Sequence, residues 1–166
     1  NFNKDTPQLS SVLKYGKYDD SQKDIILMFE AIERSVDPLS LFKKASSKLK
    51  PGGLCFITTH LSSGFEIKIL KEASEVFIPP EKMNIFSYEG IAKLIEIDGS
   101  FDILEFSTPG VLDVSNVKEK LNKSHDFSFI DYILKVRQGQ NFDKSLLEFI
   151  QMNRLGTFGR IVLRKK

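Results

Sequence analysis

The chain has 166 residues, of which 41% are hydrophobic and 28% are charged, and its formal net charge is +2. A chain of this size can bury a hydrophobic core, and so small a charge gives no argument for a nucleic-acid or membrane-surface partner. One cysteine, Cys55, excludes an internal disulfide framework, and its place in an apolar run predicts a buried structural thiol.

No apolar run approaches the about 20 residues that cross a bilayer. The segment that begins at Asn1 has no signal-peptide pattern and no initiating methionine. We therefore expect a cytoplasmic protein whose N-terminus has been cut.

The first predicted elements form a strand, a helix and a second strand. Residues 24–29 are a nearly unbroken apolar run, which favours a strand covered on both faces. Asp37 and Pro38 supply an N-cap and a first helical residue, and apolar side chains recur at helical spacing as far as Leu49. The turn Lys50-Pro51-Gly52-Gly53 ends that helix, and residues 54–59 are a second apolar run. Such a unit makes the two strands parallel neighbours.

The pattern then loosens. Residues 61–73 predict a loop that runs into a helix, and Ile78-Pro79-Pro80 ends it as an extended segment. Ser87 is the predicted N-cap of the next helix, which Gly99 closes. Residues 101–106 alternate apolar and acidic side chains, as in a half-exposed strand.

The C-terminal part predicts helices and one more strand. A helical insertion is expected from about Asn116 to Asn153, with Gly139 between its two parts. A last strand is expected over residues 158–163. Repeats and low-complexity segments are absent from the sequence, so residues 1–166 are predicted to form a single domain.

Several of these segments resemble one family, the class I S-adenosylmethionine-dependent methyltransferases. Residues 24–33 resemble its fourth strand with the acidic tail, and residues 49–54 resemble its turn into the fifth strand. Residues 78–87 and 106–113 are similar to the C-terminal portion of a bacterial subgroup known only as methyltransferases. The resemblance covers most of the chain, from about Leu13 onward.

The resemblance implies an α/β fold with a Rossmann-like, mostly parallel sheet and an antiparallel last strand. The N-terminal strands of that fold would be missing, and the helical insertion would precede the last strand. The implied cofactor is S-adenosylmethionine. By resemblance, Gly16, Lys17 and Tyr18 would lie near its adenine. Phe29, Glu30 and Ala31 would line the cofactor wall, although a core position for Phe29 and a solvated Glu30 are the simpler alternatives.

The sequence also departs from the family. The Gly-x-Gly-x-Gly loop after the first strand and the acidic residue after the second are both absent. The family commonly has a Glu-His pair after its fourth strand, where this chain has Glu33-Arg34. We therefore expect this chain alone to be inactive.

Ligands of open α/β sheets bind beyond the carboxyl ends of the strands. His60 follows the second strand at that edge, and it is a candidate general base because histidine exchanges protons readily near neutral pH. A hydrogen-bonded loop histidine is the simpler alternative. His125 is expected to have a local structural role, and the acidic residues have no histidine at ligand spacing, so no metal site is predicted.

An aromatic group in the helical insertion has two interpretations. Its members either roof a substrate pocket or pack an appended helical pair, and packing is the expected role. The group consists of Phe127, Phe129, Tyr132 and Phe142.

Three functional hypotheses remain. The first is methyl transfer to a small-molecule acceptor, with catalysis by proximity and proton removal. The second is a non-catalytic binding or scaffolding remnant of the same fold. The third is a different α/β enzyme, although a Gly-x-Ser-x-Gly elbow is absent. No nucleic-acid or membrane partner is expected, and self-association through an exposed edge at residues 25–29 is predicted.

Overall fold

The computed structural model describes residues 22–121, 129–136 and 140–166. Within these ranges the strands form one four-stranded sheet of order β1-β2-β4-β3. β1 (Lys23–Phe29) and β2 (Leu49–His60) are parallel. β4 (Phe158–Lys165) runs antiparallel both to β2 and to β3 (Phe101–Ser107), so β1, β2 and β3 share one direction. The prediction of a mostly parallel sheet with an antiparallel last strand is confirmed.

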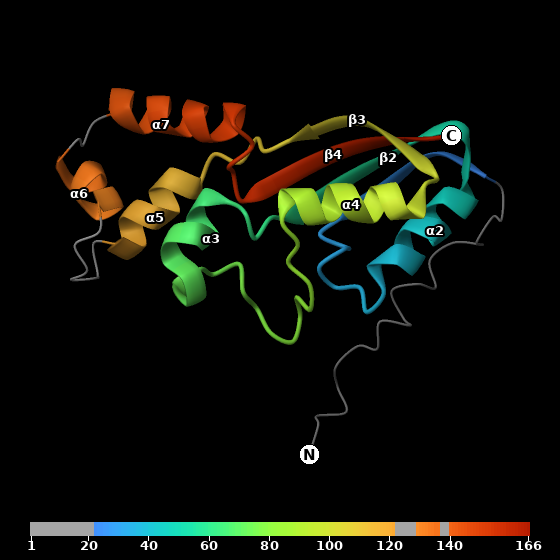
Figure 1. The fold of residues 1–166 in the computed structure, drawn as a ribbon, viewed down its shortest axis with the longest axis horizontal. Coiled ribbons are helices and arrows are strands. Elements are labelled where there is room, and N and C mark those ends of the chain that lie inside the picture. Colours follow the sequence, from blue (N-terminus) through green and yellow to red (C-terminus); the bar gives the residue numbers. More distant parts are fainter. Residues whose placement is uncertain (1–21, 122–128, 137–139) are drawn as a thin grey trace, which may run out of the picture.

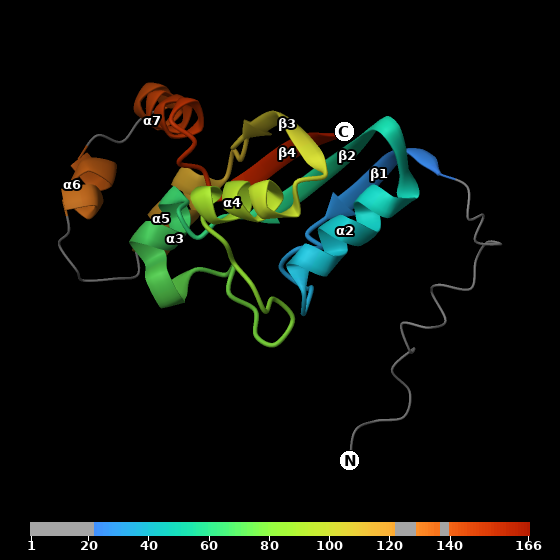
Figure 2. The same cartoon turned by 45° about the vertical axis from the view of Figure 1, so that its right-hand side comes forward.

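Two helices cover one face of this sheet, α2 (Pro38–Lys48) and α4 (Tyr88–Asp98) (Figures 1 and 2). Both begin at the predicted caps. Asp37 accepts a hydrogen bond from the Ser40 amide at 3.0 Å, and Ser87 accepts one from the Gly90 amide at the same distance. Between helices and sheet lies the main core, whose fully buried members include Phe42, Leu49, Ile57, Ile91 and Ile161.

The turn between α2 and β2 differs from the expectation. The helix ends at Lys48, and Leu49 already pairs with Lys23 of β1. The next pair of the ladder joins Ile25 to Leu54, so residues 50–53 project from the sheet as an irregular excursion. Gly52 has a φ of 77° at this point, which explains the need for glycine in the turn.

The opposite face of β1 is bare within the described part of the chain. Ile25, Leu27 and Phe29 are 55%, 59% and 62% exposed. The prediction that residues 24–29 form a strand was right, but the prediction that both its faces are covered was wrong here. The physical reason is that α2 and α4 lie on the same side of the sheet, toward which Met28 points.

The predicted alternation in β3 is interrupted. Ile103 pairs with Leu163 and Glu105 with Val162, which leaves Leu104 as an extra residue. The extra residue exchanges the faces toward which the following side chains point. Phe101 and Phe106 are therefore both buried, although a spacing of five positions would place them on opposite faces of a regular strand.

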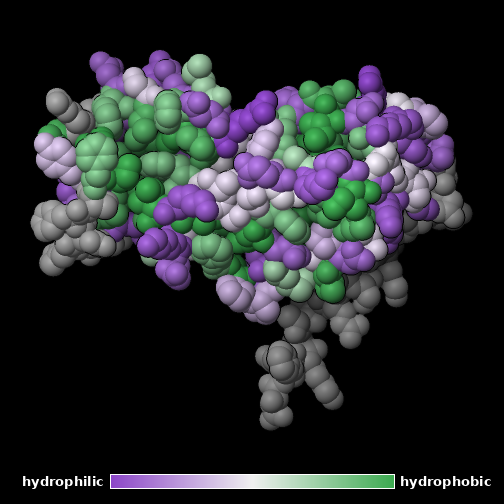
Figure 3. Space-filling model, viewed as in Figure 1, coloured by the Kyte–Doolittle hydropathy of each residue, from purple (hydrophilic) through white to green (hydrophobic). Residues whose placement is uncertain are grey.

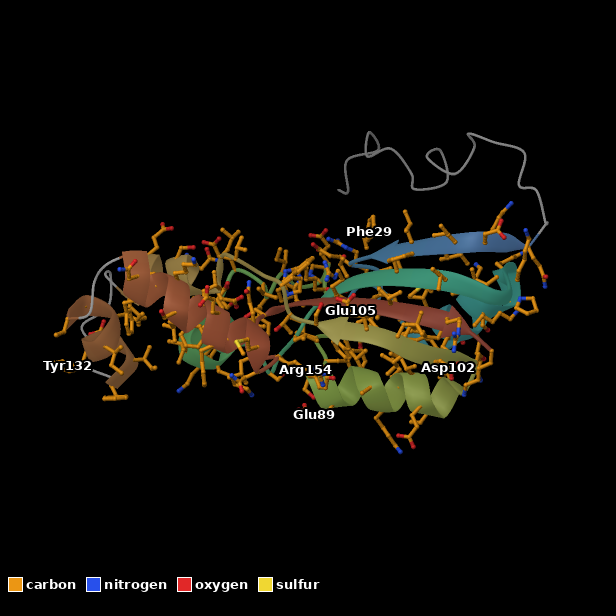
Figure 4. All side chains as sticks on the ribbon, turned by 90° about the horizontal axis from the view of Figure 1, so that it is seen from above. Phe29, Glu89, Asp102, Glu105, Tyr132 and Arg154 are labelled. Carbon is orange, nitrogen blue, oxygen red and sulfur yellow. The ribbon has the colours of Figure 1, made fainter. Side chains whose placement is uncertain are left out.

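The remaining helices form a lobe beyond the carboxyl ends of β1, β2 and β3 (Figures 1 and 4). It contains α3 (Phe65–Leu70), a 3₁₀ turn (Lys71–Ala73), α5 (Asp113–Leu121), α6 (Phe129–Val136) and α7 (Gln140–Met152). The predicted insertion therefore begins three residues earlier than expected, and Gly139 lies outside the described residues.

The lobe has its own small core, which includes Leu70, Val117, Leu134 and Ile150. Apolar side chains also reach its surface (Figure 3). Phe129 and Tyr132 are 73% and 60% exposed, and Figure 4 shows Tyr132 far from the sheet.

Candidate functional site

A pocket of about 430 Å³ lies where the sheet meets the helical lobe. It begins at His60, the last residue of β2, and at Phe158, the first residue of the antiparallel neighbour β4. Apolar walls come from side chains that include Val76, Val111 and Leu112. The pocket thus lies beyond the carboxyl end of a parallel strand, where open α/β sheets bind ligands.

His60 lines this pocket with an imidazole that is only 18% exposed. Its Nδ1 lies 3.3 Å from Oε1 of Glu33, and its backbone N–H donates to the same oxygen at 2.7 Å. The ring edge packs against the Phe158 ring, with centroids 6.1 Å apart. Within the described residues the Nε2 atom has no hydrogen-bond partner, so it is the ring nitrogen available to a ligand.

Glu33 has no exposed surface. Burial alone would raise the pKa of its carboxyl group, but the hydrogen bonds from the ring and backbone of His60 outweigh it and lower that pKa. Glu33 is therefore ionised at neutral pH. Its Oε2 atom is buried and accepts no hydrogen bond from the described residues. The hydrogen bonds to Oε1 are therefore important for the stability of the buried charge.

Lys82 connects the pocket with the end of β1. Its side chain is 5% exposed, and its Nζ lies 3.1 Å from Nδ1 of His60 and 3.5 Å from Oε2 of Glu30. Arg34 also approaches Glu30, at 3.7 Å, and pairs with Glu81 on its other side. Glu33 and Lys82 thus contact the histidine directly, and Glu30 and Arg34 extend the ion pairs from Lys82 toward the end of β1.

The predicted cofactor residues at the end of β1 lie together on the same sheet edge. Glu30 has a φ of 47°, a left-handed backbone that is costly for a residue with a Cβ, and its N–H donates to the carbonyl of Thr58. Phe29 presents an exposed ring, shown in Figure 4, while Ala31 packs against the main core. Gly16, Lys17 and Tyr18 lie outside the described residues, as does His125.

The far wall of the pocket is acidic. Glu66, 5% exposed, accepts hydrogen bonds from Ser74 at 2.8 Å and from Asn116 at 2.7 Å. Asp113, 3% exposed, accepts one from the Thr157 amide at 2.9 Å. Both carboxylates are thereby fixed in position beside the pocket.

The sequence marked Glu33 only through the Glu33-Arg34 pair, without a role in the site, and it did not identify Lys82, Glu66 or Asp113. Each reaches the site through the tertiary fold, because Glu33 is 27 positions from His60 and Lys82 is 22 positions from it. No cluster of three or more histidine, cysteine or acidic side chains in the described ranges has the geometry of a metal site. The aromatic side chains of α6 do not line the pocket.

A parallel strand pair with a crossover helix, an antiparallel last strand and a pocket beyond the strand ends define a Rossmann-like fold of the methyltransferase type. The sequence matches the family described as "Methyltransferase domain" over residues 4–99, more than half of the chain. The chain belongs to this methyltransferase family.

Solved structures with this fold include a methyltransferase from Thermotoga maritima, a possible histamine N-methyltransferase. It is 17% identical, with a TM-score of 0.50, over 89% of this chain and 58% of that protein. A Galdieria sulphuraria protein, provisionally a sarcosine dimethylglycine methyltransferase, is 24% identical, with a TM-score of 0.45. The match covers 89% of this chain and 55% of that protein. The cyclopropane synthase MmaA2 from Mycobacterium tuberculosis is 17% identical, with a TM-score of 0.45. The match covers 89% of this chain and 57% of that protein.

The chain thus spans little more than half the length of these structures. No protein of curated function matches it. Among the described residues, no helix combines the length and apolar character that crossing a membrane requires.

Proposed function

We propose that this chain is the acceptor-binding part of an S-adenosylmethionine-dependent methyltransferase that acts on a small molecule. The observation that carries the proposal is the pocket beside His60 at the carboxyl end of β2. Lys82, which lines this pocket, lies 3.5 Å from Glu30, one of the predicted cofactor residues at the end of β1. The size of the pocket suits a small acceptor rather than a macromolecule.

The cofactor would lie along the end of β1, against Phe29, Glu30 and Ala31. The exposed ring of Phe29 offers an apolar surface, and the left-handed backbone at Glu30 turns the chain sharply at the strand end. When bound, S-adenosylmethionine supplies a methyl group on a sulfonium. Gly16, Lys17 and Tyr18 remain proposed adenine neighbours.

The chain's own contribution is to hold the acceptor and accept its proton. A nucleophile that carries a proton must lose it as the new bond to carbon forms, and Nε2 of His60 is free to take it. The apolar walls exclude water, while Glu66 and Asp113 hydrogen-bond to the polar groups of the acceptor. Proximity and orientation supply the rest of the rate enhancement.

The test uses the product of the complete reading frame that contains these residues. This protein is incubated with S-adenosylmethionine labelled in the methyl group and with the low-molecular-weight fraction of a cell extract. Label should appear in a small molecule, and the His60→Gln variant should transfer about 10²-fold or more slowly, the usual contribution of a general base. If no label moves, or if His60→Gln transfers as fast as the parent protein, the corresponding part of the proposal is wrong.

A further inference from the structure

One ring nitrogen of His60 has two neighbours of opposite character. Oε1 of Glu33 lies 3.3 Å from Nδ1, and Nζ of Lys82 lies 3.1 Å from the same atom. An ionised carboxylate can only accept a hydrogen bond, whereas an ammonium group can only donate one. In a neutral imidazole, Nδ1 serves one of them at a time.

The two neighbours therefore favour different tautomers. If Nδ1 donates to Glu33, the ring proton is on Nδ1 and Nε2 is an acceptor. If Nδ1 accepts from Lys82, the proton is on Nε2, and that atom cannot act as a base toward the pocket. The position of one proton thus decides whether His60 can serve in the proposed reaction.

We propose that Glu33 is a positioning residue that holds the proton of His60 on Nδ1 and keeps Nε2 free toward the pocket. This inference deepens the proposed function and rests on it for its catalytic meaning. The placement of the proton itself does not depend on methyl transfer.

Glu33 loses more than Lys82 does when Nδ1 of His60 serves the other neighbour. Glu33 is fully buried, and its Oε2 receives no hydrogen bond from the described residues. Among the side chains that donate to this carboxylate, the His60 ring lowers its pKa more than the Thr59 hydroxyl does, and the ring nitrogen lies 3.3 Å from Oε1. A buried carboxylate that loses a donor is strongly destabilised. Lys82, in contrast, retains Glu30 at 3.5 Å.

The geometry of Glu33 points the same way. Its Oε1 is already anchored by the His60 amide at 2.7 Å, so this oxygen is fixed next to the ring of the same residue. The low pKa of the Glu33 carboxyl group agrees with an acceptor role. The other group that packs on the imidazole, the Phe158 ring, cannot titrate.

The test is nitrogen-15 NMR of the chain with labelled histidine. A His125→Gln substitution leaves His60 as the only labelled residue, because the sequence has two histidines. At neutral pH the parent should show a protonated Nδ1 and an unprotonated Nε2. Glu33→Gln should change the tautomer ratio toward protonated Nε2 by about tenfold or more, the factor expected for a lost charge-assisted hydrogen bond.

Lys82→Met is the matched control, because it removes the competing donor and leaves Glu33 in place. Its spectrum should keep the protonated Nδ1. The inference is overturned if the parent has its proton on Nε2, or if Lys82→Met changes the tautomer and Glu33→Gln does not. If Glu33→Gln does not fold, the spectra of the parent and of Lys82→Met still test the inference, because both should show the proton of His60 on Nδ1.

Methyl transfer separates this inference from the proposed function. A protonated Nδ1 in the parent, combined with full transfer activity of His60→Gln in the complete protein, would refute the base role and leave the Glu33 inference standing. An active complete protein whose parent spectrum shows the proton on Nε2 would refute the inference alone.

Discussion

Gly64 lies against the backbone of Thr157 so closely that a Cβ on residue 64 would stand 2.3 Å from the Thr157 Cα. This contact joins the start of α3 to the segment before β4. It also brings the amide of Glu66 to 3.1 Å from the Thr157 hydroxyl. The positions of Glu66 and Thr157 in the pocket wall therefore depend on this contact.

Gly64→Ala should therefore destabilise the protein. The added methyl group meets backbone atoms that cannot rotate away, and overpacking of this kind costs about 1–3 kcal/mol. The free energy of unfolding, measured in denaturant, should fall by that amount or more. Gly90→Ala is the control, because its Cβ would have ordinary contacts from 3.4 Å outward inside α4 and should leave stability unchanged or raise it by about 0.5–1 kcal/mol. Equal effects of the two substitutions would contradict the close packing.

Asp37 should make stability depend on acid. Hydrogen bonds from the Ser40 hydroxyl and amide lower the pKa of its carboxyl group. A carboxyl group whose pKa is lower in the folded state stabilises that state above its unfolded pKa and loses this effect as pH falls through the folded value. In thermal melts, the melting temperature of Asp37→Ala should lie below that of the parent at neutral pH and close to it in strong acid.

Asp37→Asn keeps an oxygen that can cap the helix but cannot ionise. It should be less destabilised than Asp37→Ala, and its difference from Asp37→Ala should not vary in the acid range. If the difference in melting temperature between the parent and Asp37→Ala stays constant with pH, the charge of Asp37 does not stabilise α2.

Cys55 should be unreactive in the folded protein. Burial raises the pKa of its thiol to about 12, and only the thiolate reacts quickly. A disulfide reagent at mildly alkaline pH should modify the chain at the rate of unfolding, with fast and complete modification in denaturant. Rapid stoichiometric modification under native conditions would contradict the buried position in β2.

The bare face and edge of β1 should make the chain self-associate. β1 pairs only with β2 among the described residues, and Leu27 is 59% exposed next to two other apolar side chains. Leu27→Lys should decrease the weight-average mass in sedimentation experiments at high concentration. Val36→Lys, at a loop residue that is 87% exposed, should have no such effect. A sharply monomeric parent chain would refute this prediction.

Local signals account for most of the fold. The Asp37 and Ser87 caps and the left-handed Gly99 mark helix ends by chemistry that lies within a few residues, so the sequence predicts them well. The bulge at Leu104 and the bare face at Leu27 depend on which neighbours the strand meets. The hydrophobic pattern of one strand does not contain that information.

The site was predicted in part for the same reason. His60 follows a recognisable strand, so its place at the sheet edge could be inferred. Its partners Glu33 and Lys82 belong to connections whose course depends on the packed helices. The resemblance marked Glu33 only as the first residue of the Glu33-Arg34 pair, and Lys82 has no distinctive sequence pattern. Phe29 and Glu30 were expected at the cofactor wall, and this remains a prediction.

The most direct test of the central claim is calorimetric titration of S-adenosylhomocysteine into the complete reading-frame product. We expect saturable binding at one site per chain. Phe29→Ala should weaken it by up to about tenfold, the range for loss of an aromatic contact, and Leu104→Ala on β3 should not. Absence of binding by the folded complete protein, or equal binding by the parent and Phe29→Ala, would contradict a cofactor site at the end of β1.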